Sequence, residues 1–248
     1  MIEVRGLHKR FGDATAVQDL SFTARDGAIT GVLGENGAGK STTLAMICGM
    51  HKVDRGTISV DGAALEKDRL GLRRGVSALL DQSGLYPRLS ARENIRFFGR
   101  LRGLSYADLE ARLDAIVSLF GLDRISDRRT AGFSQGERMK VALGRAVIHS
   151  PRNLLLDEPT NGLDIPSVRA LRTLLQDMRD RGACIILSSH LTEEVRALCD
   201  HVVVISRGRL IAQGRPHDLC RETGTASLED AFVKLTSPVE AAACPSIQ

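Results

Sequence analysis

The sequence predicts an α/β fold in which a largely parallel sheet follows an antiparallel β portion and is interrupted by a helical segment. Strand-like and helix-like stretches alternate both before residue 84 and after residue 152, which is typical of βαβ units. Between these positions the hydrophobic period stays near 3.6, which indicates consecutive helices. A glycine-rich stretch also directly follows an apolar strand and opens a helix, as in many parallel-sheet proteins.

The first third of the chain is expected to consist mainly of strands. Polar and apolar residues partly alternate there, and Asp26-Gly27 marks a turn. One helix is expected among the strands, over residues 39–50, with an apolar face through Leu44 and Ile47. The expected strands are 2–7, 17–24, 29–33, 56–62 and 76–81.

Two capping boxes mark helices in the inserted segment, Ser90 with Glu93 and Ser134 with Glu137. The sheet is expected to resume after this segment, with Pro166 at the first position of a helix that reaches about residue 181. The later helices are expected at 106–120 and 135–149, and the later strands at 153–157, 184–188, 201–206 and 209–213.

These patterns predict one domain over residues 1–236. Its sheet core is expected to comprise 1–83 and 153–225, and its helical subdomain 84–152. The polar, proline-containing stretch 237–248 is expected to be a poorly ordered tail.

Composition and charge exclude several classes of protein. The chain has 248 residues, of which 43% are hydrophobic, and this excludes disordered and fibrous classes. Its five cysteines are scattered without a C-x-x-C pair, so neither a disulfide framework nor a zinc site is expected. The net charge of +4 is too small for a nucleic-acid binder. The segment 84–152 is more basic, with 13 basic and 7 acidic residues, which fits either an anionic partner or a solvated helical face.

The chain shows no pattern for secretion or membrane insertion. Its first residues include Glu3 and Arg5 and no apolar h-region. No window reaches the roughly 18 uncharged apolar residues that a spanning helix needs. We therefore expect a cytoplasmic protein, and any role at a membrane would depend on another protein.

Residues 34–41 match the phosphate-binding pattern G-x-x-x-x-G-K-[ST], in the required place between an apolar strand and a helix. The glycines let backbone N–H groups turn toward phosphate oxygens, and the helix N-terminus adds its positive dipole end. Lys40 is expected to contact the β- and γ-phosphates of a bound nucleotide, and the Ser41 hydroxyl to bind Mg²⁺. The residues expected to hold the nucleotide are Gly34, Glu35, Asn36, Gly37, Ala38, Gly39, Lys40, Ser41 and Thr42.

Four further polar residues are expected beside the phosphates because they follow strands of the predicted sheet. Asp157 would bind Mg²⁺ through water, and Glu158 would act as general base toward the attacking water. His190 would contact the γ-phosphate, and Gln82 would bind Mg²⁺ or the attacking water. Single histidines and glutamines are also often structural, so both interpretations of the last two residues remain open.

The remaining motifs resemble the nucleotide-binding domain of ATP-binding cassette (ABC) proteins over about residues 1–225. The most specific is Phe-Ser-Gln-Gly-Glu at 133–137, which is similar to the LSGGQ signature of that family and precedes a helix. The resemblance implies a P-loop NTPase (RecA-like) fold: a mixed-sheet core with an N-terminal antiparallel β subdomain and an inserted α-helical subdomain. The other matching motifs, in the family's order, are Arg145-Ala146, Asp-Glu-Pro-Thr at 157–160, Gly-Leu-Asp at 162–164 and His190.

The resemblance also implies that two such domains, identical or different, close head to tail around two ATP molecules. Each ATP would contact the phosphate loop of one chain and Ser134 and Gly136 of the other, with Asp164 at their interface. A second helix N-terminus at Ser134 is consistent with this, because it offers a second anion site. Phe11 matches the position of the aromatic residue that stacks on adenine.

The chain departs from the family pattern at three positions. Gln135 replaces the first signature glycine, Glu137 replaces the final glutamine, and Phe11 stands where tyrosine is commoner. Gly136 is retained, where the backbone must approach phosphate closely. The departures concern contacts outside the phosphate loop, and the expected catalytic residues are all present, so we expect a hydrolytically competent site.

The resemblance implies an ATP-binding and ATP-hydrolysing subunit that energises transport by a separate transmembrane subunit, at the cytoplasmic face of the membrane. A soluble ABC ATPase acting on ribosomes or nucleic acid is the alternative. A single cassette without a long coiled coil favours transport, and no nucleic-acid partner is expected. The closest resemblance is to bacterial ATPases of the drug and sodium efflux kind, in the sequence of residues 157–164 and in the pair Ser188-Ser189. This resemblance favours export.

Residues 86–100 are the expected docking surface for the transmembrane subunit, because they follow Gln82. Arg92, Arg96 and Arg100 recur at every fourth position there. This spacing places them on one helix face, where they are expected to form a basic stripe.

Overall fold

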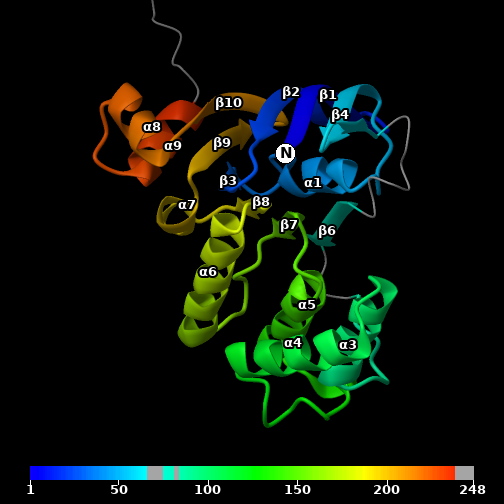
Figure 1. Cartoon of the computed structure of the whole chain (residues 1–248). Helices are drawn as coiled ribbons and strands as arrows, with labels where there is room; N and C mark the ends of the chain where they lie inside the picture. The colour runs from blue at the N-terminus through cyan, green and yellow to red at the C-terminus, as the bar shows by residue number, and fades with distance from the viewer. Residues whose placement is uncertain (66–74, 81–83, 238–248) are drawn as a thin grey trace, which may run out of the picture.

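The structure is a computed structural model that describes residues 1–65, 75–80 and 84–237 (Figure 1). Within these residues a four-stranded antiparallel sheet lies over a six-stranded mixed sheet, and helices α3 to α5 extend below them. This is the predicted P-loop NTPase architecture. Gln82 and all of the predicted tail 237–248 except Ser237 lie outside the described residues.

The antiparallel sheet has the strand order β2-β1-β4-β5. Its first two strands form a hairpin and are longer than predicted. Register shifts between Val4 and Leu7 and again between Leu7 and Lys9 break the period of two, so the alternating pattern does not reveal the whole strand. The strands are β1 (Ile2–Phe11), β2 (Ala14–Ala24), β4 (Arg55–Val60) and β5 (Ala63–Ala64).

The six-stranded sheet has the order β10-β9-β3-β8-β7-β6. All neighbouring strands in it are parallel except β10, which pairs antiparallel with β9. Both faces are covered: Leu154 and Leu156 belong to one hydrophobic cluster and Leu155 to the other. This explains why the strands are almost continuously apolar. The strands are β3 (Ala28–Leu33), β6 (Val76–Leu79), β7 (Asn153–Asp157), β8 (Cys184–Ser189), β9 (His201–Ser206) and β10 (Arg209–Gly214).

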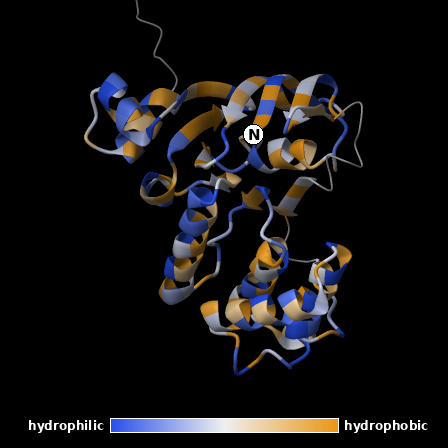
Figure 2. Ribbon diagram, in the orientation of Figure 1, coloured by the Kyte–Doolittle hydropathy of each residue, from blue (hydrophilic) through white to orange (hydrophobic). Residues whose placement is uncertain are grey.

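Helices cover the six-stranded sheet on both faces. The helix α1 (Lys40–Ile47) contributes Leu44 and Met46 to the cluster between the two sheets. On the other face, α6 (Ile165–Asp180) buries Leu171 and Leu175, and it carries both hydrophobic and hydrophilic residues in Figure 2. Pro166 is its second residue rather than its first, because Asp164 is the N-cap.

Three short helices near the end of the described chain were not predicted. They are α7 (Thr192–Leu198), α8 (Pro216–Thr223) and α9 (Leu228–Thr236). Among the described residues, no helix is both long and apolar enough to cross a bilayer.

The helical segment consists of α3 (Ala91–Leu101), α4 (Tyr106–Leu119), a short 3-10 helix (Thr130–Gly132) and α5 (Gln135–Val147). Both predicted capping boxes are present, at Ser90 with Glu93 and at Ser134 with Glu137. The buried amide of Asn94 in α3 donates to the carbonyl oxygens of Tyr86 and Ser90 and so fixes the turn that precedes this helix.

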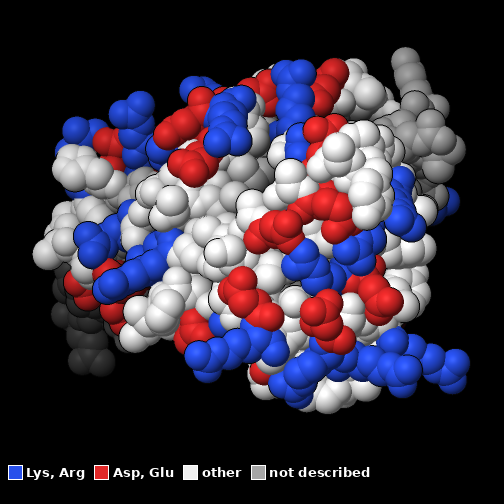
Figure 3. Space-filling model, turned by 60° about the horizontal axis from the view of Figure 1, so that its bottom comes forward, with Lys and Arg blue, Asp and Glu red and all other residues white. Residues whose placement is uncertain are grey.

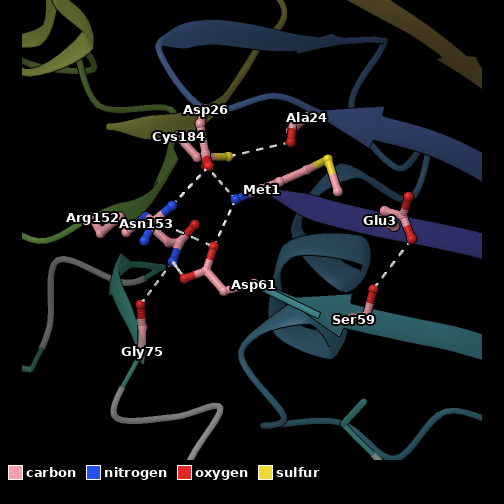
Figure 4. Close-up of polar contacts among 10 residues, drawn as sticks. All are labelled: Met1, Glu3, Ala24, Asp26, Ser59, Asp61, Gly75, Arg152, Asn153 and Cys184. Carbon is pink, nitrogen blue, oxygen red and sulfur yellow. Dashed lines mark hydrogen bonds and ion pairs between the residues drawn. The ribbon is translucent and has the colours of Figure 1, made fainter. Parts of the chain in front are cut away.

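A polar cluster connects the antiparallel sheet to the start of β7 (Figure 4). The ammonium of Met1 forms ion pairs with Asp26 and, at 2.7 Å, with Asp61. Arg152 lies 3.0 Å from Asp26, and the Asn153 amide donates to Asp61 at 2.8 Å. The cluster therefore holds the two sheets together on the side away from the phosphate loop.

Candidate functional site

The phosphate loop joins β3 to α1 and can be built only with glycine at two of its positions. A Cβ at Gly34 would lie 2.4 Å from the Ile205 carbonyl oxygen. At Gly39, the N-cap of α1, φ is +102° and a Cβ would lie 2.5 Å from the Ala16 carbonyl oxygen. The loop is therefore held between β2 and the end of β9, directly before the N-terminus of α1, which is the end of a helix that favours anions.

Lys40 is buried at the start of α1, with its side chain folded back over the loop. Its Nζ donates to the carbonyl oxygens of Gly34, at 2.7 Å, and Glu35, at 3.1 Å. It also lies 3.4 Å from Glu158 Oε1. The structure thus brings together the predicted phosphate-contacting lysine and the predicted base.

Glu158 directly follows β7 and has the left-handed backbone conformation, with φ +47°. Its N–H lies 3.2 Å from Ser188 Oγ and its Oε2 lies 2.9 Å from His190 Nδ1. Its Oε1 is buried and has no hydrogen-bond partner among the described residues. Strained backbone of this kind persists where the surroundings fix it, and here it turns the carboxylate toward Lys40.

Asp157 is paired in register with Ser188, because β7 and β8 are adjacent parallel strands. The Ser188 hydroxyl donates to Asp157 Oδ1. Ser41 lies in the first turn of α1, and α1 packs against β7. A carboxylate and a hydroxyl are hard oxygen ligands, so these residues fit Mg²⁺. Ser188 was not among the predicted site residues, although its place beside Asp157 follows from the strand order.

A second cluster forms at the N-terminus of α5, from the predicted signature residues and the loop after β7. A Cβ at Gly136 would lie 2.4 Å from the Gly162 carbonyl oxygen, so glycine is needed there for contact within the chain. Gly136 was predicted only to let the backbone approach phosphate, so this contact within the chain is a second reason for glycine there. The Gly162 contact connects the loop that begins at Glu158 to the signature helix.

Asp164 is the N-cap of α6 and accepts a hydrogen bond from the Ser167 N–H at 2.8 Å. Lys140 of α5 lies 2.9 Å from its other oxygen. Hydrogen bonds from Ser167 and Lys140 lower the pKa of the Asp164 carboxyl to about 2. Asp164 therefore remains charged and ties α6 to the signature helix, and Lys140 is a part of this cluster that the sequence analysis missed.

Phe11 is the last residue of β1, where it pairs with Ala14 of β2, and it is 45% exposed. Its ring forms a T-shaped pair with the His51 ring, with ring centroids 5.3 Å apart, and Lys9 Nζ lies 5.2 Å from the Phe11 centroid. An exposed aromatic face is what adenine stacking requires, and that role stays a prediction.

The predicted docking surface is aromatic, and its charges are largely paired. Tyr86, Phe97 and Phe98 pack together, and the Arg145 guanidinium lies 3.9 Å from the Phe98 ring centroid. The expected basic stripe does not form as predicted, because α4 provides two partners that the spacing along α3 does not reveal. These ion pairs are Arg92 with Asp114 and Arg96 with Glu110.

Figure 3 shows acidic and basic side chains side by side on the helical end of the molecule. Arg100 has no ion-pair partner in the part of the chain that the structure describes, and Leu101 beside it is 65% exposed. This end of the molecule therefore offers aromatic and apolar groups rather than a continuous basic stripe.

Comparison with known proteins supports the family resemblance of the sequence motifs. The family model described as ABC transporter matches residues 17–161. The ABC transporter ATP-binding protein NatA of Bacillus subtilis (strain 168) is 40% identical over 238 residues, which are 94% of this chain and 97% of that protein. The linearmycin resistance ATP-binding protein LnrL of the same organism is 34% identical, over 95% of this chain and 75% of that protein.

Among solved structures, one described as the ATP-binding subunit of an ABC transporter superposes with a TM-score of 0.90 at 33% identity. The match covers 96% of this chain and 100% of that one. Sequence, fold and site geometry therefore agree with one another. The chain belongs to the ABC transporter family, as one of its ATP-binding proteins.

Proposed function

We propose that the chain binds Mg-ATP on its phosphate loop and hydrolyses it to drive a membrane transporter. The observation that carries this proposal is Glu158 Oε1: a buried carboxylate oxygen without a hydrogen-bond partner among the described residues, 3.4 Å from the lysine of a phosphate loop. A carboxylate in this position can accept a proton from a water molecule that lies between it and a bound phosphate.

The hydrolytic step uses groups that already lie in contact. When ATP binds, Lys40 exchanges its loop carbonyl partners for the β- and γ-phosphates, and this removes a cation from Glu158 Oε1. Glu158 then takes one proton from water as the water oxygen bonds to the γ-phosphorus and ADP leaves. His190 holds the other carboxylate oxygen at 2.9 Å and keeps the base oriented. Mg²⁺ bound by Ser41 and, through water, by Asp157 would supply positive charge to the phosphate oxygens.

Transport requires that hydrolysis at Glu158 changes the contact between this chain and another one. We propose that two copies, or this chain and a similar one, close head to tail with Ser134 of each facing the ATP of the other. The close contact between Gly136 and Gly162 supports this, because it couples the loop after Glu158 to the signature helix. Phosphate release would thereby alter the interface between the two chains both at Glu158 and at the signature helix.

We propose that a separate membrane subunit docks on the exposed aromatic residues of the turn before α3 and of α3 itself. Tyr86 and Phe97 are 47% and 38% exposed, and Leu101 continues their surface. This would place the chain at the cytoplasmic face of the membrane. The names of two kinds of relative, a linearmycin resistance protein and Nod factor export proteins of several bacteria, support export as the direction.

Membrane association in the native cell tests the transporter part of this proposal. Phe97→Glu should release the protein from the membrane fraction, since it puts a charge into the apolar docking surface, whereas hydrolysis by the purified protein should stay within about twofold of wild type. Ile211→Glu on β10 is a matched control, because Ile211 is 40% exposed against 38% for Phe97. Equal membrane association of both variants would contradict docking through α3.

A further inference from the structure

The two capping boxes of the helical segment have nearly the same geometry. At α3, the Ser90 N–H donates to Glu93 Oε2 at 2.7 Å and the Glu93 N–H donates to Ser90 Oγ at 3.1 Å. At α5, the corresponding distances for Ser134 and Glu137 are 2.8 and 3.2 Å. A carboxylate therefore lies directly against the N-terminus of each helix.

At α5, no cation of the part of the chain that the structure describes lies within ion-pair distance of this carboxylate. Glu137 forms no ion pair within the described residues. The nearest cations along the helix have other partners: Lys140 pairs with Asp164, and Arg138 donates to the Ala131 carbonyl oxygen at 3.4 Å. Glu137 therefore places a carboxylate where the proposed function brings in the γ-phosphate of a second chain.

The same helix end still offers donors for that phosphate. The N–H groups of Gln135 and Gly136 are the first two of α5, and they have no acceptor within the helix. The Ser134 hydroxyl accepts from the Glu137 N–H and keeps its own proton to donate. An incoming phosphate can thus be bound, but next to a like charge.

We propose that the Glu137 carboxylate, which caps α5, weakens ATP-driven dimerisation; we call it the charged cap. This inference rests on the proposed head-to-tail dimer. When the γ-phosphate of the partner approaches, the carboxylate either stays and repels it or swings away and gives up the hydrogen bond to Ser134. Both responses oppose closure. The glutamine that the family pattern has at this position would make the same hydrogen bond without the charge.

The test uses Glu137→Gln, which keeps the capping geometry and removes only the charge. It is made in a Glu158→Gln background so that ATP is not consumed, and dimer formation with Mg-ATP is measured by sedimentation over a range of protein concentrations. The dimer should become about fivefold to tenfold tighter, as expected when two like-charge contacts near a protein surface, one at each ATP of the dimer, are removed. The gain should shrink as salt is raised from 50 to 500 mM, because salt screens the repulsion.

Glu93→Gln in the same background is the matched control, because it makes the same change in the other capping box. It should leave the dimer constant unchanged. A purely structural role of Glu137 would instead give the two variants similar changes in melting temperature and similar dimer constants. ATP affinity of the monomer should be the same in both, because the monomer's own nucleotide lies on the phosphate loop.

The outcomes separate this inference from the proposed function. A dimer constant for Glu137→Gln equal to that of its parent, with dimers present in both, overturns the charged cap and leaves the proposed function standing. A tighter dimer only in Glu137→Gln supports the charged cap. ATP binding without dimers in any variant, at concentrations up to the solubility limit, overturns both.

Discussion

Replacing Glu158 with glutamine is expected to lower ATP turnover by at least about 100-fold while ATP affinity stays within a few fold of wild type. The amide has the shape of the carboxylate and its oxygen can still face His190, which lies 2.9 Å away in the native protein. It cannot accept the proton of the attacking water. Phosphate release measures the turnover, and calorimetry with Mg-ATP measures the affinity.

The variant should also accumulate as a dimer with ATP, because the proposed interface between the two chains opens only after hydrolysis. Glu193→Gln is a suitable control: Glu193 is an exposed carboxylate in α7, a few residues from His190, and its partner is Arg196. Turnover in the control should match wild type. Phosphate release that is unchanged in Glu158→Gln would exclude Glu158 as the base.

Replacing Lys40 with alanine is expected to weaken binding of Mg-ATP by about 100-fold, since charge-assisted hydrogen bonds to phosphate are each worth roughly 1.5–3 kcal/mol. The nucleotide-free protein loses contacts as well, because Lys40 Nζ donates to Gly34 and Glu35 and lies beside Glu158 Oε1. Calorimetry gives the affinity, and a thermal melt reports how much stability is lost.

Lys234→Ala separates the loss of a lysine from the loss of the phosphate contact. Lys234 donates to the Thr223 carbonyl oxygen at 2.7 Å, the same distance as from Lys40 to the Gly34 carbonyl oxygen. It should bind ATP like wild type. If Lys40→Ala melts below room temperature, Lys40→Met, which keeps the apolar stem, replaces it. Undiminished ATP affinity in a folded Lys40 variant would refute its role.

The parts of the site that lie on contiguous motifs could be predicted from the sequence. The loop from Gly34 to Ser41 is recognised because it lies between a strand and a helix. The acids at the end of β7 are recognised because they directly follow an apolar strand. The contacts that hold them could not be predicted in the same way. Ser188 lies beside Asp157 only because β7 and β8 are neighbours in register. Strand order is a property of the whole sheet, which the local pattern does not contain.

The same distinction explains what was missed in the helical segment. The spacing of Arg92, Arg96 and Arg100 correctly places them on one face, but it says nothing of the acids that α4 brings to two of them. The contact between Gly136 and Gly162 likewise joins two loops of distant sequence. The unpredicted helices α7 to α9 lie after the helical segment and are 7 to 9 residues long, so each contains only about two turns of a hydrophobic period.

A structure of the Glu158→Gln variant with Mg-ATP tests the central claim most directly. We predict a dimer in which each γ-phosphate lies within hydrogen-bond distance of Lys40 of one chain and of Ser134 of the other, with the amide of residue 158 facing the same phosphate. ATP bound to a monomer at saturating concentration, or a dimer whose Ser134 helices point away from the nucleotide, would contradict it.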